Sequence, residues 1–393
     1  MGKLTVEQLE VEGKAILVRV DFNVPLNDGH VGDDTRIRAA LPTIRHLIQR
    51  GAKVVLASHL GRPKGEANPK YTLRPVATRL QELLGSPVAF SPEVVGDAAK
   101  SAVEAMSPGD VLLLENVRYH AGEEANDPEF AKALANLADG FVSDAFGTVH
   151  RAHASTAGVA ALFPQAACGF LIAKELEFLG QALFQPQSPY VAIVGGAKVG
   201  DKIAVINSLL ERADKLLIGG AMAYTFLKAL GHTVGTSLLD EPNLELAGKL
   251  IEQSKAQGKE IMLPVDHLIA DKPAPDAIAE TCNIDIPDGK MALDIGPNTV
   301  RNYQAALSGA KMIVWNGPMG MFEMPPFQKG TFAIAYAVAD SNAVSIVGGG
   351  DSVAAANQAG VSDRISHIST GGGASLEFLE GKQLPGIVAL TEV

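Results

Sequence analysis

The chain has few cysteines, no long apolar run and little spare positive charge, and each shortage excludes a class of protein. Cys168 and Cys282 are the only cysteines among 393 residues, which excludes a disulfide framework, and no Cys/His spacing suggests zinc. The most apolar stretch, residues 160–173, is interrupted by Pro164, and the first 14 residues lack the apolar region of a secretion signal. We therefore expect a cytoplasmic protein without a membrane span.

The charge balance is acidic. The sequence has 44 acidic and 33 basic side chains, a net charge of −11, which opposes binding to nucleic acid or to an anionic membrane. With 47% hydrophobic and 20% charged residues the composition is that of a globular protein. At about 150 residues per domain, this length predicts two or three domains, and two is our starting expectation.

Short apolar runs alternate with helical patterns, which predicts parallel sheets covered by helices. The expected strands are residues 15–20, 53–57, 111–114, 141–143, 191–194, 216–218, 260–263, 312–315 and 344–347. Apolar residues between Ile37 and Ile48 follow a helical period, with Asp33 or Asp34 as the N-cap. A helix over 171–183 runs into the proline-containing segment 184–190, after which the strand and glycine pattern starts again. A second doubly wound domain is therefore expected there.

Arginines are concentrated in the first half of the chain. Ten of the 13 precede residue 152. Several polar residues lie at or near the ends of expected strands: Arg19, Asp21, Asn23, His59, Arg62, Arg118 and Arg151. Ligands of open α/β sheets lie beyond the carboxyl ends of the strands, and arginine pairs with carboxylate or phosphate oxygens, so the cluster fits a small acidic substrate. Taken alone, any one of these arginines is better explained as a solvated surface residue than as a substrate ligand. Asp21 fits a substrate hydroxyl or the orientation of a guanidinium equally well, and His59, His150 and His153 fit ordinary hydrogen bonding better than a base or a metal ligand.

Glycine-rich turns follow the strands of the second half. The segment 191–203 is a strand, a glycine turn and a helix that places Lys198 and Lys202 in or near its first turn, which favours a bound anion. It matches neither GxxxxGK[ST] nor GxGxxG. In the turn 348–352, Asp351 can share Mg²⁺ with phosphate oxygens or simply cap a helix. In the turn 369–375, the backbone amides can face a phosphoryl group, and the glycines can act as a hinge.

Six stretches together carry a family resemblance. They are Arg19–Leu26 (RVDFNVPL), Ser58–Gly65 (SHLGRPKG), Gly195–Lys202 (GGAKVGDK), Trp315–Glu323 (WNGPMGMFE), Gly348–Ser352 (GGGDS) and Ser369–Ser375 (STGGGAS). On these motifs the chain resembles the bacterial phosphoglycerate kinases from end to end. The resemblance implies an α/β fold of two Rossmann-like, doubly wound parallel-sheet domains joined by an interdomain helix and hinge. It implies a 3-phosphoglycerate-binding domain over 1–172, the helix over 173–184, an MgATP/ADP-binding domain over 185–373, and a segment 374–393 that returns to the first domain.

The same resemblance implies roles for individual residues. The expected 3-phosphoglycerate ligands are Asp21, Phe22, Asn23, Arg36, His59, Leu60, Gly61, Arg62, Arg118 and Arg151. The expected nucleotide ligands are Gly196, Ala197, Lys198, Lys202, Gly219, Gly296, Asn316, Glu323, Gly349, Gly350, Asp351 and Ser352, with Asp351 on Mg²⁺ and Glu323 on the ribose. The expected catalytic groups, which neutralise the transferring phosphoryl, are Arg36, Lys198 and the amides of Gly371, Gly372 and Gly373. Ala221, Met319 and Met321 depart from common family residues around the adenine pocket.

The chemistry implied is reversible in-line transfer of a phosphoryl group between ATP and the carboxylate of 3-phosphoglycerate after domain closure, by a monomer. A carboxylate is already a nucleophile, so no general base is required. Another ATP-dependent carboxylate phosphotransferase is the alternative enzyme, although an acetate-like substrate brings no second anion to the arginines. A non-catalytic scaffold with the same fold is the other alternative, and damaged site motifs would be its mark.

Overall fold

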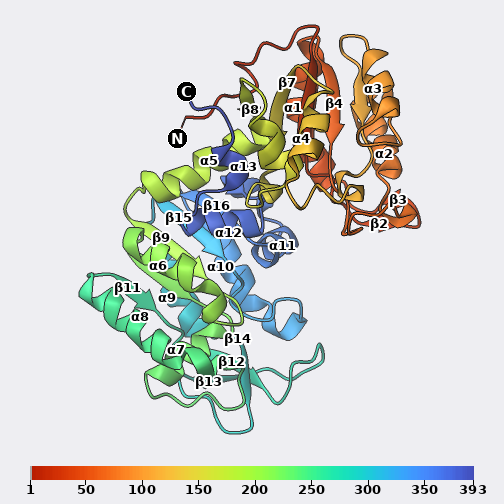
Figure 1. Ribbon diagram of the computed structural model, residues 1–393. Coiled ribbons are helices and arrows are strands. Elements are labelled where there is room, and N and C mark those ends of the chain that lie inside the picture. The colour runs from red at the N-terminus through yellow and green to blue at the C-terminus, as the bar shows by residue number, and fades with distance from the viewer. Residues whose placement is uncertain (1) are drawn as a thin grey trace. The chain divides into compact units, whose positions relative to one another are not determined.

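The computed structural model describes residues 2–393, and Figure 1 shows its helices and strands. Contacts divide the chain into two compact units, residues 1–177 with 383–393 and residues 178–382. The helix α5 (Phe170–Phe184), expected over 171–183, runs across this division. No helix among the described residues is long and apolar enough to span a bilayer.

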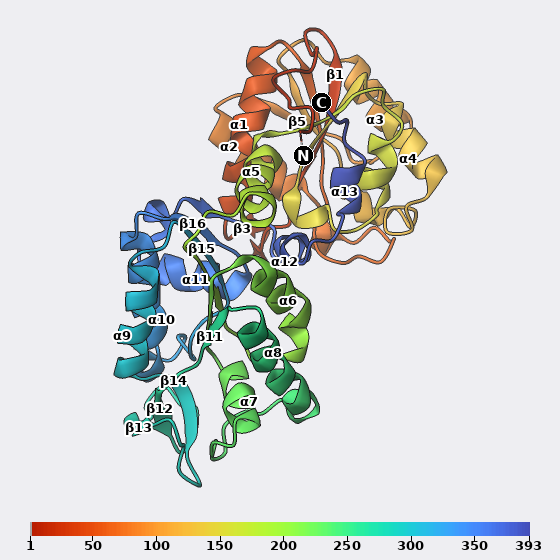
Figure 2. The ribbon, with the colours of Figure 1, turned by 90° about the vertical axis from the view of Figure 1, so that its left-hand side faces the viewer.

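The first unit contains a six-stranded parallel sheet in the order β5-β6-β4-β1-β7-β8. Its strands are β1 (Ala15–Val20), β4 (Lys53–Ala57), β5 (Val88–Phe90), β6 (Val111–Leu113), β7 (Gly140–Asp144) and β8 (Ala166–Cys168). The helices of this unit are α1 (Thr35–Gln49), α2 (Arg74–Leu84), α3 (Asp97–Glu104), α4 (Pro128–Ala135) and α13 (Pro385–Val388). In Figure 2, α1 and α2 lie on one side of the sheet and α3 and α4 on the other, as doubly wound sheets require.

The second unit contains another six-stranded parallel sheet, in the order β11-β10-β9-β15-β16-β17. Its strands are β9 (Tyr190–Val194), β10 (Lys215–Ile218), β11 (Glu260–Met262), β15 (Met312–Asn316), β16 (Val344–Val347) and β17 (His367–Ile368). The helices are α6 (Ile203–Arg212), α7 (Met222–Ala229), α8 (Leu244–Ala256), α9 (Pro297–Leu307), α10 (Lys329–Asp340), α11 (Gly350–Gln358) and α12 (Gly373–Leu379). The predicted α/β class with two parallel sheets is confirmed.

Each expected strand is present, with ends that differ by no more than one residue. The prediction missed three strands of the parallel sheets, β5, β8 and β17. It also missed a three-stranded antiparallel sheet of β12 (Asp266–Ala270), β13 (Glu280–Asn283) and β14 (Met291–Ile295), and the hairpin of β2 (Leu26–Asn27) and β3 (His30–Val31). The missed strands of the parallel sheets and the hairpin have only two or three residues each, and β13 is mostly exposed, so none of them carries a long apolar run. The strands β12 and β14 are mostly buried, and the prediction simply missed them.

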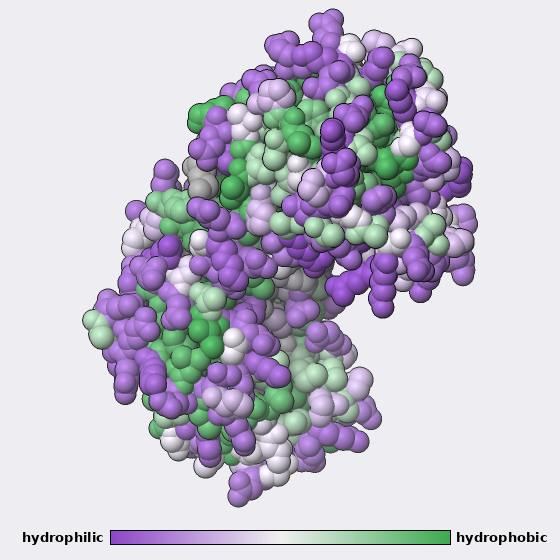
Figure 3. Space-filling model, in the orientation of Figure 1, coloured by the Kyte–Doolittle hydropathy of each residue, from purple (hydrophilic) through white to green (hydrophobic). Residues whose placement is uncertain are grey.

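Burial of the strands explains the core. Every residue of β1, β7, β9 and β15 is buried, as expected for parallel strands covered on both faces. Trp315, the single tryptophan, is fully buried in the core of the second unit. The face shown in Figure 3 is largely hydrophilic, with apolar residues appearing in small separate areas.

The carboxyl-terminal segment belongs to the first unit. The Leu4 N–H donates to the Thr391 carbonyl oxygen at 2.9 Å, and the Gly386 N–H donates to the Val149 carbonyl oxygen at 2.8 Å. A Cβ on Gly386 would lie 2.9 Å from the Val149 Cα, so the close approach of these backbones requires glycine. By contacts, residues 383–393 belong to the first unit, whereas the family resemblance implies a returning segment that begins at residue 374.

Candidate active site

The carboxyl ends of the first parallel sheet gather most of the expected substrate residues. β1 pairs with β4 on one side and β7 on the other, so the segments that follow these strands share one edge. Asp21 follows β1, His59 follows β4, and Arg118 lies in the 3₁₀ turn Val117–Tyr119 after β6. Arg36 is the second residue of α1, whose start brings it to the same edge. The structure therefore brings residues from distant parts of the first unit together.

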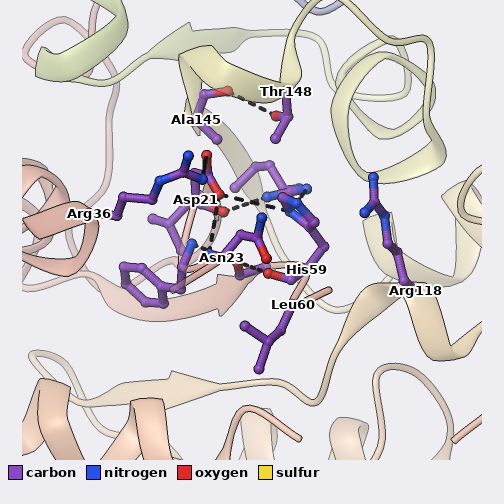
Figure 4. Close-up of polar contacts among 12 residues, drawn as sticks. Asp21, Asn23, Arg36, His59, Leu60, Arg118, Ala145 and Thr148 are labelled. Carbon is purple, nitrogen blue, oxygen red and sulfur yellow. Dashed lines mark hydrogen bonds and ion pairs between the residues drawn. The ribbon is translucent and has the colours of Figure 1, made fainter. Parts of the chain in front are cut away.

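Asp21 and Arg36 form a direct ion pair, which Figure 4 shows as a dashed contact. The Arg36 Nη1 donates to Asp21 Oδ2 at 2.7 Å, and the pair joins the end of β1 to the first turn of α1. Next to it, the Asn23 Oδ1 accepts a hydrogen bond from the Gly61 N–H at 2.9 Å. These contacts order the two loops that follow β1 and β4.

The N-terminus of α1 differs in detail from the expected cap. Asp34 occupies the N-cap position without a side-chain cap bond, because its carboxylate accepts hydrogen bonds from Arg38 and Arg79. Asp33 instead accepts the Thr35 N–H at 2.8 Å. Both predicted acidic residues therefore help to fix the start of the helix that carries Arg36.

His59 is buried at this edge, where its surroundings favour the neutral imidazole. Burial first, and then the positive charges of Arg19, Arg118, Arg36 and Arg151, hold its pKa well below the usual range. The Arg19 Nη2 lies 3.3 Å from His59 Nδ1. A guanidinium has no acceptor, so Nδ1 accepts this bond and the ring carries its proton on Nε2. A neutral imidazole amid four guanidinium charges is suited to donating one hydrogen bond to an anion.

The remaining expected substrate residues divide into two kinds. Arg62 and Arg151 have exposed side chains, and the Arg118 Nη1 donates to the Gly61 carbonyl oxygen at 2.8 Å. The side chains of Phe22 and Leu60 are buried in the apolar core. The Phe22 N–H donates to Ser58 Oγ at 2.9 Å, so that residue helps to shape the loop.

Asn116 is a residue that the sequence analysis missed. It is fully buried, and its side-chain amide donates to the carbonyl oxygens of Leu60 at 2.7 Å and Tyr71 at 2.9 Å. Its Oδ1 accepts the N–H groups of Leu60 and Arg118, so one side chain joins the His59 loop to the Arg118 turn. The signal was available, since a polar Glu–Asn pair directly follows the apolar run 111–114.

A separate cavity of about 940 Å³ lies beside the turn 29–34 and α2. Its lining includes Arg38 and Arg79, but both pair with Asp34, and Arg79 also pairs with Glu82. Because these charges largely neutralise one another, the cavity offers little net positive charge to an acidic ligand.

The second parallel sheet repeats the arrangement with glycine turns. Gly195 and Gly196 follow β9, Gly219 follows β10, and Gly348 to Gly350 follow β16. Lys202, at the N-cap of α6, donates from Nζ to Asn316 Oδ1, and Asn316 Nδ2 donates to the Gly348 carbonyl oxygen at 2.8 Å. Asn316 thus connects the turn after β9 to the turn after β16. A Cβ on Gly349, which has φ +92°, would lie 2.8 Å from Asn316 Nδ2, so this turn requires glycine.

The two lysines of the first glycine turn lie before the helix. The 3₁₀ turn Gly200–Lys202 precedes α6, so Lys198 lies in the loop with an exposed side chain and not in a helical turn. The Gly200 N–H donates to Asp240 Oδ2 at 2.9 Å, and this bond chiefly, with a smaller contribution from the Lys198 charge, lowers the pKa of Asp240. Burial lowers the pKa of Lys202, and the nearby Asp351 carboxylate opposes that shift.

Asp351 is exposed in the first turn of α11 and makes no cap bond, since the N-cap position is Gly349. Among residues 2–393 there is no group of three or more acidic, histidine or cysteine side chains able to enclose a metal. A single carboxylate beside a glycine turn is compatible with Mg²⁺, which proteins commonly hold through one or two carboxylates and substrate phosphates.

Several expected nucleotide residues have structural partners. A Cβ on Gly219 would lie 2.3 Å from Met319 Sδ, so the glycine lies against that buried methionine. The buried Ser352 Oγ accepts the Gly317 N–H at 2.5 Å. Gly296 is the N-cap of α9, and Glu323 is exposed. Of the three glycines expected to contact the phosphoryl group, Gly371 already donates its N–H to Ser369 Oγ at 3.2 Å.

Comparison with known proteins identifies the family. The phosphoglycerate kinase family model matches residues 6–382. The chain belongs to the phosphoglycerate kinase family. It is 56% identical to the phosphoglycerate kinase of Clostridium novyi, over 100% of this chain and 99% of that protein. It is also 56% identical to the phosphoglycerate kinase of Acidobacterium capsulatum, over 100% of both chains.

Solved structures agree with this assignment. The phosphoglycerate kinase of Coxiella burnetii matches with a TM-score of 0.92 and 44% identity, over 98% of each chain. That of Pyrococcus horikoshii matches with a TM-score of 0.84 and 34% identity, also over 98% of each chain. Membership of the phosphoglycerate kinase family makes the protein a phosphotransferase with a carboxyl group as acceptor, acting between ATP and 3-phosphoglycerate.

Proposed function

We propose that the first unit holds 3-phosphoglycerate at the carboxyl ends of β1, β4, β6 and β7, and that the second unit holds MgATP at its glycine turns. The observation that carries the first assignment is the set of four guanidinium charges acting on one buried, neutral histidine, His59. A substrate with both a phosphate and a carboxylate can pair with several arginines at once, which acetate cannot do.

The substrate residues divide into groups that bind and groups that orient. Arg62, Arg118 and Arg151 supply positive charge, His59 donates from Nε2, and Asp21 fixes the guanidinium of Arg36. The backbones of Phe22, Asn23, Leu60 and Gly61 shape the loops that carry these side chains. Arg36, with its side chain 42% exposed, retains enough free surface to reach a ligand.

On the nucleotide side, Lys198 supplies an exposed cation, and Lys202 and Asn316 hold two glycine turns in register. Glu323 is proposed to accept hydrogen bonds from the ribose, and Gly196, Ala197, Gly219 and Gly296 to line the nucleotide. Mg²⁺, held by Asp351 and the phosphates, would neutralise charge on those phosphates. The backbone amides of Gly372 and Gly373 are proposed to face the transferring group.

The reaction needs no protein base because the acceptor is a carboxylate. The low pKa of His59 makes its imidazole a weak base, and the hydrogen bond from Arg19 occupies the lone pair on Nδ1, so a binding role fits better than proton abstraction. Positive charge from Arg36 and Lys198 is proposed to stabilise the three equatorial oxygens of the phosphoryl group in the transition state. Direct transfer requires the two ligands to meet, so domain closure stays part of the proposal, as do a monomeric state and a cytoplasmic location.

The test is a coupled assay for Mg²⁺-dependent formation of ADP from ATP, run with 3-phosphoglycerate and, separately, with acetate. We expect turnover with 3-phosphoglycerate and none above background with acetate. Turnover with acetate at a similar kcat/KM would favour another carboxylate phosphotransferase. Tight nucleotide binding without ADP formation would favour a non-catalytic scaffold.

A further inference from the structure

A chain of buried polar groups lies behind His59, and it begins at Glu123. Glu123 is fully buried in the loop before α4. Its Oε2 accepts the Ser155 N–H at 2.9 Å, and its Oε1 accepts the Ser155 hydroxyl at 2.6 Å. Burying a carboxylate costs free energy unless it is paired and hydrogen-bonded. The buried Glu123 carboxylate is therefore expected to stabilise a neighbouring positive charge.

The neighbour is Arg19. The Ser155 Oγ, which donates to Glu123, also accepts a hydrogen bond from Arg19 Nε at 2.7 Å. Arg19 is 1% exposed, and a second nitrogen of its guanidinium, Nη2, lies 3.3 Å from His59 Nδ1. The Ser155 hydroxyl therefore links the Glu123 carboxylate to the Arg19 guanidinium, and the guanidinium in turn contacts the His59 imidazole.

The charge of Glu123 compensates the buried charge of Arg19. Burial lowers the pKa of Arg19, and the negative charge of Glu123 is the largest influence that opposes this, ahead of that of Asp21. Asp21 is also the partner of Arg36, so Glu123 is the carboxylate that balances Arg19 without being shared with that arginine. Without Glu123, Arg19 would be a poorly compensated buried cation.

We propose that Glu123 and Ser155 are positioning residues of the phosphoglycerate site, holding Arg19 so that His59 keeps its proton on Nε2 and directed to the substrate. For the part that concerns substrate this rests on the proposed function, whereas the tautomer of His59 is a property of the chain of contacts itself. A purely structural role is the competing explanation, since the Glu123 carbonyl oxygen also accepts the Ala154 N–H at 2.9 Å and joins the two loops.

The experiment compares Glu123→Gln and Ser155→Ala with the wild-type full-length protein. The ring nitrogens of His59 are observed by ¹⁵N NMR and assigned with a His59→Asn variant, and the KM values for 3-phosphoglycerate and ATP are measured. We expect the Nε2–H pattern of His59 to change to a mixture of tautomers in both variants. We expect the KM for 3-phosphoglycerate to rise about tenfold, the size of a lost charge-assisted hydrogen bond, with the KM for ATP unchanged.

Asp127→Ala is the matched control. Asp127 lies in the same loop and caps α4 by accepting the Phe130 N–H at 2.8 Å, so its loss disturbs the loop but not the chain to Arg19. Should Glu123→Gln fail to fold, Ser155→Ala carries the test, because it removes one hydroxyl and leaves the carboxylate in place.

Two results would overturn the proposal: a His59 tautomer unchanged in folded Ser155→Ala, or a KM for 3-phosphoglycerate that Asp127→Ala raises as much as the two test variants do. Failure of the proposed function is distinguishable, since the wild-type protein would then show no turnover with 3-phosphoglycerate while the tautomer comparison still gave its answer.

Discussion

Asp21 and Arg36 are joined by an ion pair 2.7 Å long between the residue that follows β1 and the first turn of α1. The sequence left Asp21 with two roles, binding a substrate hydroxyl or orienting a guanidinium, and the pair shows that it does orient one. The Arg36 side chain is 42% exposed whereas that of Asp21 is 14% exposed. The carboxylate is thus the fixed partner, and the guanidinium presents its remaining donors outward.

Arg36→Ala should lower kcat about 1,000-fold, because a cation that stabilises the charge of the transferring group is lost. The Kd for ATP, measured by calorimetry, should change much less, since Arg36 belongs to the other unit. Arg38→Ala is the matched control, because Arg38 lies one half-turn further along the same helix and pairs with Asp34. A kcat near normal in Arg36→Ala would remove the residue from the catalytic role.

Lys198→Ala should also cost several kcal/mol in the turnover barrier, on the order of a 1,000-fold loss of kcat, since its exposed ammonium adds positive charge at the first glycine turn. In contrast to Arg36→Ala, nucleotide affinity should fall as well, because the lysine is on the nucleotide side. Lys215→Ala is a suitable control, since this lysine pairs with Glu260 at the start of β10. Steady-state kinetics together with ATP calorimetry would show whether the two losses occur together.

Asp351→Asn separates a magnesium ligand from a helix cap. Because the Asp351 side chain makes no cap bond in α11, its replacement should leave the melting temperature nearly unchanged. The Mg²⁺ concentration for half-maximal activity should rise about tenfold or more, as expected when a carboxylate ligand becomes an amide. A large fall in melting temperature with an unchanged Mg²⁺ requirement would support the capping role. Asp363→Asn, on an exposed turn of the same unit, controls for the loss of one charge.

The sequence predicted the strands and the sheet edges better than the side-chain contacts between loops. Strands such as β1 and β15 are fully buried and largely apolar, so composition indicates them, and the carboxyl ends of parallel strands share an edge of the sheet. The Glu–Asn pair after the run 111–114 marks Asn116 as a polar residue at a strand end. The partners of Asn116 and Ser155 could not be assigned, because they lie 56 and 136 residues away along the chain, at Leu60 and Arg19. Such contacts depend on how loops pack, and no local pattern of residues encodes them.

The position of Lys198 shows the same limit. A strand, a glycine turn and a helical pattern were correctly indicated, yet the start of α6 lies at Ile203, after a 3₁₀ turn. The bond from the Gly200 N–H to Asp240, 40 residues away, helps to hold that turn. A prediction from local sequence therefore places Lys198 near the start of α6 but misses the loop in which its side chain is exposed.

Asp294 gives a prediction about stability and pH. It is fully buried at β14, and burial raises its pKa to about 8, although the N–H groups of Gly330 at 2.7 Å and Ile295 at 2.9 Å favour the ionised form. The folded protein therefore keeps a proton at Asp294 that the unfolded chain loses above about pH 4. Since the folded state binds the extra proton, the free energy of unfolding should fall as the pH rises from about 4 to about 8, and this decline should stop above that range.

Asp294→Asn stays neutral at every pH and should lack this decline. Relative to the wild type, its free energy of unfolding should gain up to about 4 kcal/mol between pH 5 and pH 8, at about 1.4 kcal/mol per pH unit. Trp315, the single tryptophan, is buried in the same unit, so its fluorescence during urea unfolding reports the transition directly. Asp288→Asn removes the same charge from an exposed position and serves as the control. Parallel pH profiles for the wild type and Asp294→Asn would show that Asp294 is ionised in the folded protein throughout this range, contrary to the expectation from its burial.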